Sequence, residues 1–343
     1  MKTAFPELVG NSMLKERFRD EILGGTLAHA YILEGQDGSG KHLFSRLFAA
    51  ALSCENKEND DFPLPCGVCP TCKKILSGNS PDLIYIGRKD KATIGVDPIR
   101  ELRLDTAVAP NDLDVKLYVI EEAQLMTIQA QNALLLTLEE PPEYVRFLLL
   151  CESASPLLET IKSRAPLLRM EPLSGGLISE ELKKRSPEAA SLAKNDPAAF
   201  SELVAASDGS LGRALSYLDA GTQKALIAKR TLAKDFIRLA GSEKRAAETV
   251  DLLSRFPQKR EELTETCSMI LTALRDLAAI KRVDEPTLYF FSELSLAEEL
   301  AYPLSLPKIL GLEQSVAALS ESINRNANIR LALTAFASDA GLL

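Results

Sequence analysis

The sequence predicts an α/β region followed by an all-α region, and two observations support this division. Over residues 1 to about 170, short apolar runs alternate with helical stretches, as they do in domains with a mainly parallel sheet. Beyond Leu173 the strand-like runs end, and helical patterns rich in Ala, Leu, Glu and Lys continue through the sequence. At 343 residues the chain exceeds one ordinary domain, so we expect more than one.

Five short apolar runs are the expected strands of the α/β region. Polar or turn residues flank each run, as expected for strands that are buried on both faces. The runs are Ala30–Leu33, Leu83–Ile86, Leu117–Ile120, Phe147–Cys151 and Leu167–Met170. Helices are expected between them at Lys41–Ser53, Pro98–Val108 and Thr127–Leu138.

Glycines mark the expected boundaries of the helical region. Breaks in the pattern occur at Gly175-Gly176, at Gly209–Gly212 and near Ala220-Gly221. The expected domains are a core over residues 1–172, a small helical lid over 173–222 and a helical C-terminal domain over 223–343.

The composition is that of a globular protein, with 46% hydrophobic and 26% charged residues. No run of eighteen apolar residues occurs, and the first residues lack the apolar centre of a secretion signal. We therefore expect a cytoplasmic protein without membrane contact, whose cysteines are reduced or bound to metal. The net charge of -8 includes no basic block, so any contact with nucleic acid is expected from a local patch or an assembly.

A glycine-rich segment that resembles a phosphate-binding loop follows the first expected strand and opens a helix. It begins at Gly35 and ends with Gly40 and Lys41. Glycines, with Gly38 among them, let successive backbone N–H groups turn toward phosphate, while the helix N-terminus and the lysine add positive charge. The next residue is His42, where such loops have Ser or Thr to supply a hydroxyl to Mg²⁺. Imidazole is a poor ligand for this hard cation.

The acidic element on which phosphoryl transfer depends is also altered. Glu121 and Glu122 follow the strand that ends at Ile120, whereas an ATPase usually has Asp-Glu here. Glu121 is one methylene longer than aspartate, and Glu122 retains a carboxylate that can orient water. Because both positions on the metal side differ, we expect no intrinsic ATP hydrolysis, and nucleotide binding without hydrolysis stays open.

Four cysteines lie in one short window: Cys54, Cys66, Cys69 and Cys72. The last three form two consecutive C-x2-C steps, a spacing that is typical of zinc sites. Four thiolates leave no open position on a tetrahedral Zn²⁺, so the predicted site is structural and not catalytic. A set of buried free thiols is the alternative.

Three segments resemble bacterial clamp-loader subunits with an ATPase fold. Residues 27–33, LAHAYIL, resemble the family's entry into the phosphate loop. Residues 132–142, NALLLTLEEPP, are similar to its NALLKTLEEPP motif, with Leu136 in place of lysine. Residues 161–165, IKSRA, are similar to its Ser-Arg-Cys motif, with Ala165 in place of cysteine. These three segments and the cysteine cluster occur along the chain in the same order as in the family.

The resemblance implies a P-loop core of the AAA+ type with a zinc knuckle inserted at residues 54–72, a helical lid and a C-terminal collar domain that forms a ring. In this family the arginine of the Ser-Arg motif reaches the ATP of a neighbouring subunit, which implies this role for Arg164. The alternative for Arg164 is a surface arginine at the start of a strand. Arg213 resembles the lid arginine that senses phosphate in its own subunit, with a helix-surface arginine as the alternative.

Within the family, intact phosphate loops belong to gamma/tau motor subunits, and loops altered as at His42 resemble the delta-prime type. The length of the chain and the lack of an extended C-terminal tail agree with the second type. The resemblance thus implies a stator, an accessory subunit of the DNA polymerase III holoenzyme. Its implied partners are the gamma/tau and delta subunits, with the sliding clamp and primed DNA contacted through the assembly.

Two other functions remain as alternatives. The first is an ATP-hydrolysing gamma/tau-type motor subunit, against which the residues His42 and Glu121 argue. The second is a zinc-containing protein that binds nucleic acid by itself. The acidic balance and the absence of interleaved aromatic and basic residues argue against this one.

Overall fold

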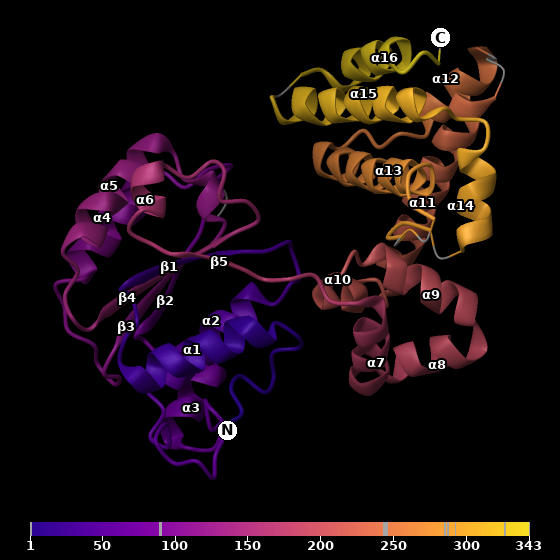
Figure 1. Cartoon of the computed structure of the whole chain (residues 1–343). Coiled ribbons are helices and arrows are strands. Elements are labelled where there is room, and N and C mark those ends of the chain that lie inside the picture. Colours follow the sequence, from indigo (N-terminus) through magenta and orange to yellow (C-terminus); the bar gives the residue numbers. More distant parts are fainter. Residues whose placement is uncertain are drawn as a thin grey trace. The chain divides into compact units, whose positions relative to one another are not determined.

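The structure is a computed structural model. It describes residues 2–88, 91–242, 246–284, 286, 288–291, 293–325 and 327–342. The chain forms two compact units (Figure 1). The first comprises Met1–Ser174 together with Ser210–Gly212, and the second comprises Gly175–Gly209 together with Arg213–Leu343.

A parallel sheet of five strands forms the centre of the first unit, in the order β2-β3-β4-β1-β5. The strands are β1 (Ala30–Glu34), β2 (Leu83–Ile86), β3 (Lys116–Ile120), β4 (Val145–Cys151) and β5 (Leu167–Arg169). Each of the five predicted strands overlaps one of these, so the strand predictions are confirmed. Because β1 lies between β4 and β5, the glycine-rich loop that follows β1 emerges from the interior of the sheet and not from its edge.

Helices cover both faces of this sheet (Figure 1). One face packs against α1 (Ser12–Gly24), α2 (Lys41–Leu52) and α3 (Pro70–Leu76), and the other packs against α4 (Val96–Asp105), α5 (Ile128–Glu139) and α6 (Glu159–Lys162). Neighbouring strand residues alternate between the two cores: Tyr31 and Leu33 belong to the first, and Ile32 belongs to the second. This two-sided burial explains why the strands are continuous apolar runs.

The predicted helices of the first unit are confirmed, with small shifts at their ends. Helix α2 begins at Lys41 as predicted. Helix α5 begins after Thr127, whose hydroxyl accepts a hydrogen bond from the Ala130 N–H at 3.2 Å. Helix α4 was predicted from Pro98 to Val108, but it begins at Val96 and ends at Asp105. Proline is tolerated in a first helical turn, so the helix starts before Pro98 and not at it.

The described part of the second unit is helical. Its first helices are α7 (Gly175–Arg185), α8 (Pro187–Asn195) and α9 (Pro197–Ala206), and α10 (Leu211–Ser216) passes from the first unit into the second at Arg213. Of the glycines expected to break the pattern, Gly175 and Gly176 form the first turn of α7 and Gly212 lies in the first turn of α10, while Gly209 lies in the turn between α9 and α10 with a φ of 79°. Ser186 and Asp196 cap α8 and α9, and a proline follows each cap.

Six further helices share one apolar core. They are α11 (Ala220–Gly241), α12 (Ala246–Ser254), α13 (Arg260–Ile280), α14 (Leu294–Ala301), α15 (Leu306–Asn324) and α16 (Ile329–Asp339). The buried Asp276 accepts hydrogen bonds from the N–H groups of Tyr289, Phe290 and Phe291, and this fixes the chain before α14. The predicted fold class, α/β followed by all-α, is confirmed.

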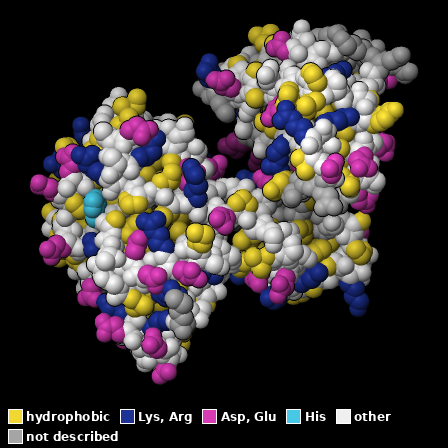
Figure 2. Space-filling model, viewed as in Figure 1, with side chains coloured by type: hydrophobic (Ala, Val, Ile, Leu, Met, Phe, Trp, Pro, Cys, Tyr) yellow, Lys and Arg dark blue, Asp and Glu magenta, His cyan; other side chains and the backbone are white. Residues whose placement is uncertain are grey.

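The charges on the surface are mixed. On the face shown in Figure 2, acidic and basic side chains are interspersed and not separated by sign. This distribution agrees with the absence of a basic block in the sequence. None of the described helices has both the length and the apolar composition needed to cross a membrane.

Candidate phosphate loop and metal centre

The glycine-rich loop between β1 and α2 needs its glycines. Gly38 and Gly40 have φ angles of 71° and 100°, in the left-handed region that other residues avoid. A Cβ on Gly35 would lie 2.8 Å from Ser39 Oγ and 3.0 Å from Met170 Cβ. The loop therefore requires glycine at these positions, and it leads into the N-terminus of α2, where phosphate-binding loops also lie.

Lys41, the lysine of this loop, is buried against the loop itself. Its Nζ donates hydrogen bonds to the carbonyl oxygen of Gly35 and, at 2.8 Å, to that of Gln36. The ammonium group is therefore bonded to backbone carbonyls of its own loop.

The segment Ser210–Gly212 covers the next part of the loop. Ser210 Oγ donates to the Asp37 carbonyl oxygen at 2.9 Å, and the Gly212 N–H donates to the Gly38 carbonyl oxygen at 3.0 Å. A Cβ on Gly212 would lie only 2.7 Å from the Gly38 backbone. Together with Lys41, this segment gives each of the four carbonyls from residue 35 to residue 38 a partner within the first unit.

His42 and Glu121, the two residues that stand where an ATPase has its Mg²⁺-binding hydroxyl and aspartate, contact each other. His42 Nδ1 lies 3.2 Å from Glu121 Oε1, and the side chains are 58% and 33% exposed. Gly87 provides the space for this carboxylate, because a Cβ there would lie 2.9 Å from Glu121 Oε2. An imidazole thus lies beside the acidic group where an ATPase would place a hydroxyl ligand for Mg²⁺.

Glu122, the residue expected to orient water, is also paired. Its Oε2 lies 2.8 Å from Arg88 Nε. Its φ of 48° is left-handed, a strained conformation for a residue other than glycine. The Arg88 guanidinium is therefore bonded to one oxygen of the Glu122 carboxylate.

The four predicted cysteine ligands lie together. Cys54 follows α2, Cys69 caps α3 and Cys72 lies in its first turn. The four Sγ atoms lie within 4.8 Å of one another, and all four side chains are buried. The Sγ atoms of Cys66 and Cys72 are 3.8 Å apart. Zn–S bonds of about 2.3 Å in a tetrahedron imply an S···S distance of about 3.8 Å, so this set of donors fits a tetrathiolate metal ion.

Hydrogen-bond donors surround the sulfur atoms. The Cys69 N–H and the Asn56 Nδ2 donate to Cys66 Sγ, each at 3.4 Å, and the Cys72 N–H donates to Cys69 Sγ at 3.3 Å. Burial raises the pKa of the Cys66 thiol, but these donors and the backbone N–H of Val68 outweigh it and hold the pKa at about 6. Burial raises the pKa of Cys54. Burial also raises the pKa of Cys72. The donors stabilise negative charge on Cys66 Sγ and Cys69 Sγ, as metal-bound thiolates require.

Arg164 lies between α6 and β5. Its Nη2 lies 3.0 Å from Glu139 Oε1 at the end of α5, and its Nη1 donates to the Thr160 carbonyl oxygen at 3.1 Å. The next residue, Ala165, is fully buried, whereas the Arg164 side chain is 36% exposed. The structure thus presents a guanidinium that is partly open to solvent on a well-packed support.

Arg213 belongs to α10 in the second unit. It interacts electrostatically with Asp208 and with Tyr217. Burial raises the pKa of Asp208, and the positive charges of Arg275 and Arg213 oppose this rise. The assignment of Arg213 as a phosphate sensor stays a prediction.

Sequence reasoning missed three participants: Arg88, the Ser210–Gly212 segment and Lys2, which contacts the cysteine-bearing loop. Of these, only the Ser210–Gly212 segment is marked in the sequence: its glycines predict a break in the helical pattern, but they do not indicate a contact with the phosphate loop. Arg88 and Lys2 carried no such signal, since Arg88 is one of three basic residues in the run RKDK (88–91) and Lys2 stands alone near the first residue.

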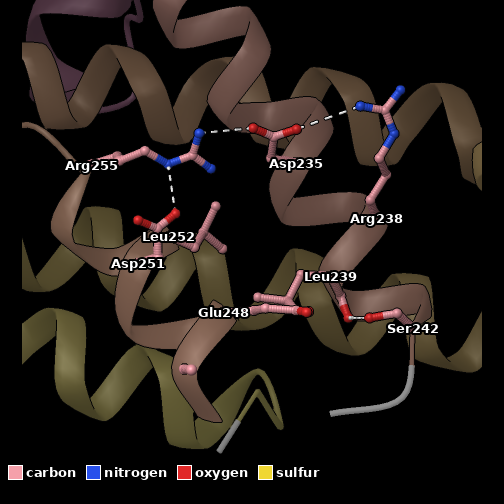
Figure 3. A pocket seen from close by; sticks show the side chains of 9 residues that line it. Asp235, Arg238, Leu239, Ser242, Glu248, Asp251, Leu252 and Arg255 are labelled. Carbon is pink, nitrogen blue, oxygen red and sulfur yellow. Dashed lines mark hydrogen bonds and ion pairs between the residues drawn. The ribbon is translucent and has the colours of Figure 1, made fainter. Parts of the chain in front are cut away.

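A cavity of about 520 Å³ lies between α11 and α12 in the second unit (Figure 3). Arg255 pairs with Asp235 at 2.9 Å and with Asp251 at 3.6 Å, and Arg238 lies 3.5 Å from Asp235. Both arginines that line the cavity are therefore already paired with carboxylates. Among the described residues that line the cavity, three carboxylates and two arginines leave no net positive charge that would favour a phosphate group.

Comparison with known proteins gives a family for the first unit. Residues 10–174 match the family model described as "DNA polymerase III, delta subunit". The chain is 32% identical to DNA polymerase III subunit tau of Bacillus subtilis over 215 residues, which cover 63% of the chain and 37% of that protein. It is 34% identical to the tau subunit of Escherichia coli over 215 residues, or 63% of the chain and 32% of that protein. The chain thus spans about a third of the length of these relatives.

Solved structures with similar chains include two related to DNA polymerase III or to a clamp loader. A gamma subunit-related protein of Thermotoga maritima has 20% identity and a TM-score of 0.41, with 95% of this chain and 98% of that one covered. The clamp loader delta protein of Bacillus subtilis has 12% identity and a TM-score of 0.34, with the same coverage. The family match over residues 10–174, which contain the parallel sheet and the glycine-rich loop, therefore relates the first unit to the subunits of DNA polymerase III.

Proposed function

We propose that this chain is a delta-prime-type subunit of the DNA polymerase III clamp loader, a cytoplasmic stator without ATPase activity of its own. The observation that carries this proposal is the contact between His42 and Glu121. It joins the two positions whose residues depart from those of an ATPase. In a motor subunit, a hydroxyl and an aspartate at these positions help to hold Mg²⁺ against the phosphates.

The pairing of Glu122 with Arg88 supports the same proposal. Hydrolysis needs a group that positions the attacking water, and a carboxylate bonded to a guanidinium is less available for this task. Lys41 and the Ser210–Gly212 segment also donate hydrogen bonds to the backbone carbonyl oxygens of the loop. These contacts support a loop that contributes to the fold of the subunit and turns over no nucleotide.

In the assembled loader, we assign Arg164 the role of an arginine finger for the ATP of an adjoining gamma/tau subunit. A guanidinium stays charged and can form paired hydrogen bonds to phosphate oxygens. Its partial exposure beside the buried Ala165 favours this role, which requires the guanidinium to leave Glu139 for the neighbour's phosphate. The helices beyond residue 223, which share a core of their own, would serve as the ring-forming collar.

We also propose that Cys54, Cys66, Cys69 and Cys72 hold a structural Zn²⁺. The support is the spacing of their sulfur atoms and the N–H donors around them. The metal would tie the loop between α2 and α3, and the four protein ligands leave it no open position for catalysis.

A gamma/tau-type motor subunit is the second candidate, because the relatives reported above are tau subunits. Reconstitution separates the two. The chain is mixed with purified gamma and delta subunits and the complex is isolated by size exclusion. A stator is expected to join a ring that already contains gamma, and the pure chain alone should release no phosphate from ATP. Failure to enter any such complex would overturn the proposed function, and rapid hydrolysis by the chain alone would favour the motor subunit.

A further inference from the structure

Lys2 contacts the loop that carries the cysteines, although it lies far from them in the sequence. Its Nζ donates hydrogen bonds to the backbone carbonyl oxygens of Asn56, Lys57 and Asn59, at 3.0, 2.6 and 2.8 Å. The Lys2 residue is only 8% exposed. These three carbonyls belong to the turn that directly follows Cys54.

The turn held by Lys2 is bonded to two of the four cysteines. The backbone N–H of Lys57 donates to the Cys54 carbonyl oxygen at 3.1 Å. Asn56 accepts a hydrogen bond from Lys2 through its carbonyl and donates one from its side-chain amide to Cys66 Sγ at 3.4 Å. Asn56 therefore links the ammonium of Lys2 to a sulfur atom of the metal centre.

The charge of Lys2 has no acidic partner. Within the described part of the chain, its ammonium bonds only to carbonyl oxygens and meets no carboxylate. A buried cation without a counter-charge is unfavourable. Zn²⁺ with four thiolates carries a net charge of about −2. The metal-loaded cysteine centre would therefore add negative charge beside the turn that Lys2 holds.

Residues 3–5 fix the position of Lys2. The Thr3 carbonyl oxygen accepts from the Leu64 N–H at 2.9 Å, and the Phe5 N–H donates to the Leu64 carbonyl oxygen at 2.6 Å. The buried Phe5 ring packs 5.4 Å from the Phe44 ring of α2. Leu64 is thus bonded to residues 3 and 5 through both its N–H and its carbonyl oxygen. These bonds hold the backbone next to Lys2 in place, so its side chain can reach the three carbonyls at little further cost in conformational entropy.

We propose that Lys2 is a positioning residue of the four-cysteine metal centre, where it orders the turn after Cys54 and balances the charge of the metal-bound thiolates. This inference rests on the proposed Zn²⁺ site. Lys2 precedes residues 10–174, the segment that the family model matches. Groups that orient metal ligands in this way typically change metal affinity by about 10- to 100-fold when they are removed.

The test uses the full chain with Lys2→Met, Lys2→Gln and Lys2→Arg, and with Lys57→Met as the matched control. Lys57 lies in the same turn and contributes only its backbone to the bonds described here. Three quantities are measured: zinc per purified chain, the rate of zinc transfer to a chromogenic chelator, and the visible absorption of the Co²⁺-substituted protein.

We expect Lys2→Met to release zinc at least about tenfold faster than wild type and to alter the Co²⁺ spectrum. Lys57→Met should behave as wild type. Lys2→Arg should retain slow release, and Lys2→Gln, which donates without charge, should fall between Met and wild type. Should Lys2→Met fail to fold, the comparison of Lys2→Gln with Lys2→Arg gives the same answer.

The outcomes distinguish this inference from the zinc site on which it rests. Wild-type protein without bound zinc, and unable to take up Co²⁺, would overturn both. Wild-type protein with one zinc, and Lys2 variants that release it no faster, would overturn only the role of Lys2. Equal release by Lys2→Gln and Lys2→Arg would refute the charge balance.

Discussion

His42 Nδ1 lies 3.2 Å from Glu121 Oε1, and this contact joins the first turn of α2 to the end of β3. The imidazole occupies the side of the phosphate loop on which an ATPase holds Mg²⁺. Each residue alone would be an ordinary departure from a motif. Their contact shows that the two departures form one local arrangement.

The first prediction concerns nucleotide turnover. The purified chain should hydrolyse ATP negligibly, because His42 provides no hydroxyl for Mg²⁺ and Arg88 pairs with Glu122. The measurement is steady-state phosphate release, with Lys41→Ala as the control for contaminating ATPases. Turnover by the wild type that disappears in Lys41→Ala would identify a motor subunit. Combining His42→Thr with Glu121→Asp should raise Mg²⁺-dependent nucleotide affinity, which a fluorescent nucleotide analogue can report.

The second prediction concerns the metal. The wild-type chain should carry close to one zinc, and Cys69→Ser should lose it, because a hydroxyl is a poor substitute for a thiolate on this ion. Elemental analysis and thiol titration measure this directly. Cys267→Ala, a buried cysteine of the second unit, is the control and should keep the metal. Four freely titrating thiols in metal-free wild-type protein would exclude the site.

The third prediction concerns the cover of the phosphate loop. Gly212→Ala should destabilise the chain by about 1–3 kcal/mol, since its Cβ would lie 2.7 Å from the Gly38 backbone. Gly176→Ala is the matched control, a glycine in a first helical turn with nothing within 4 Å of its Cβ. Hydrogen exchange over residues 35–41 should accelerate in the first variant and not in the second. Equal exchange in both would show that the segment does not hold the loop.

Strand and helix positions followed from local patterns, but the contacts between side chains depended on strand order and register. Ile86 pairs with Ile120 in the sheet, so Arg88 and Glu122, each two residues further on, come to lie together. No pattern within either strand specifies this register. The cysteine site was predictable because three ligands lie within seven residues of chain, whereas Lys2 reaches it only through the fold.

The most direct test of the stator proposal uses Arg164. An Arg164→Ala chain should fold and assemble, because the change removes a partly exposed charge and no core volume. Loss of an arginine finger lowers kcat at one site by about 10³ or more, so the ATPase of the loader should fall to what its other sites supply. Arg164→Lys should restore only part of this ATPase activity, since an ammonium cannot present the paired, planar N–H donors of a guanidinium. Arg169→Ala, an exposed arginine on β5, is the control.

The deciding measurement is the steady-state ATPase of the reconstituted loader with sliding clamp and primed DNA. The stator proposal predicts that the Arg164→Ala complex assembles normally but hydrolyses ATP more slowly and loads fewer clamps, while the Arg169→Ala complex matches wild type. An Arg164→Ala complex with wild-type ATPase and clamp loading would contradict it.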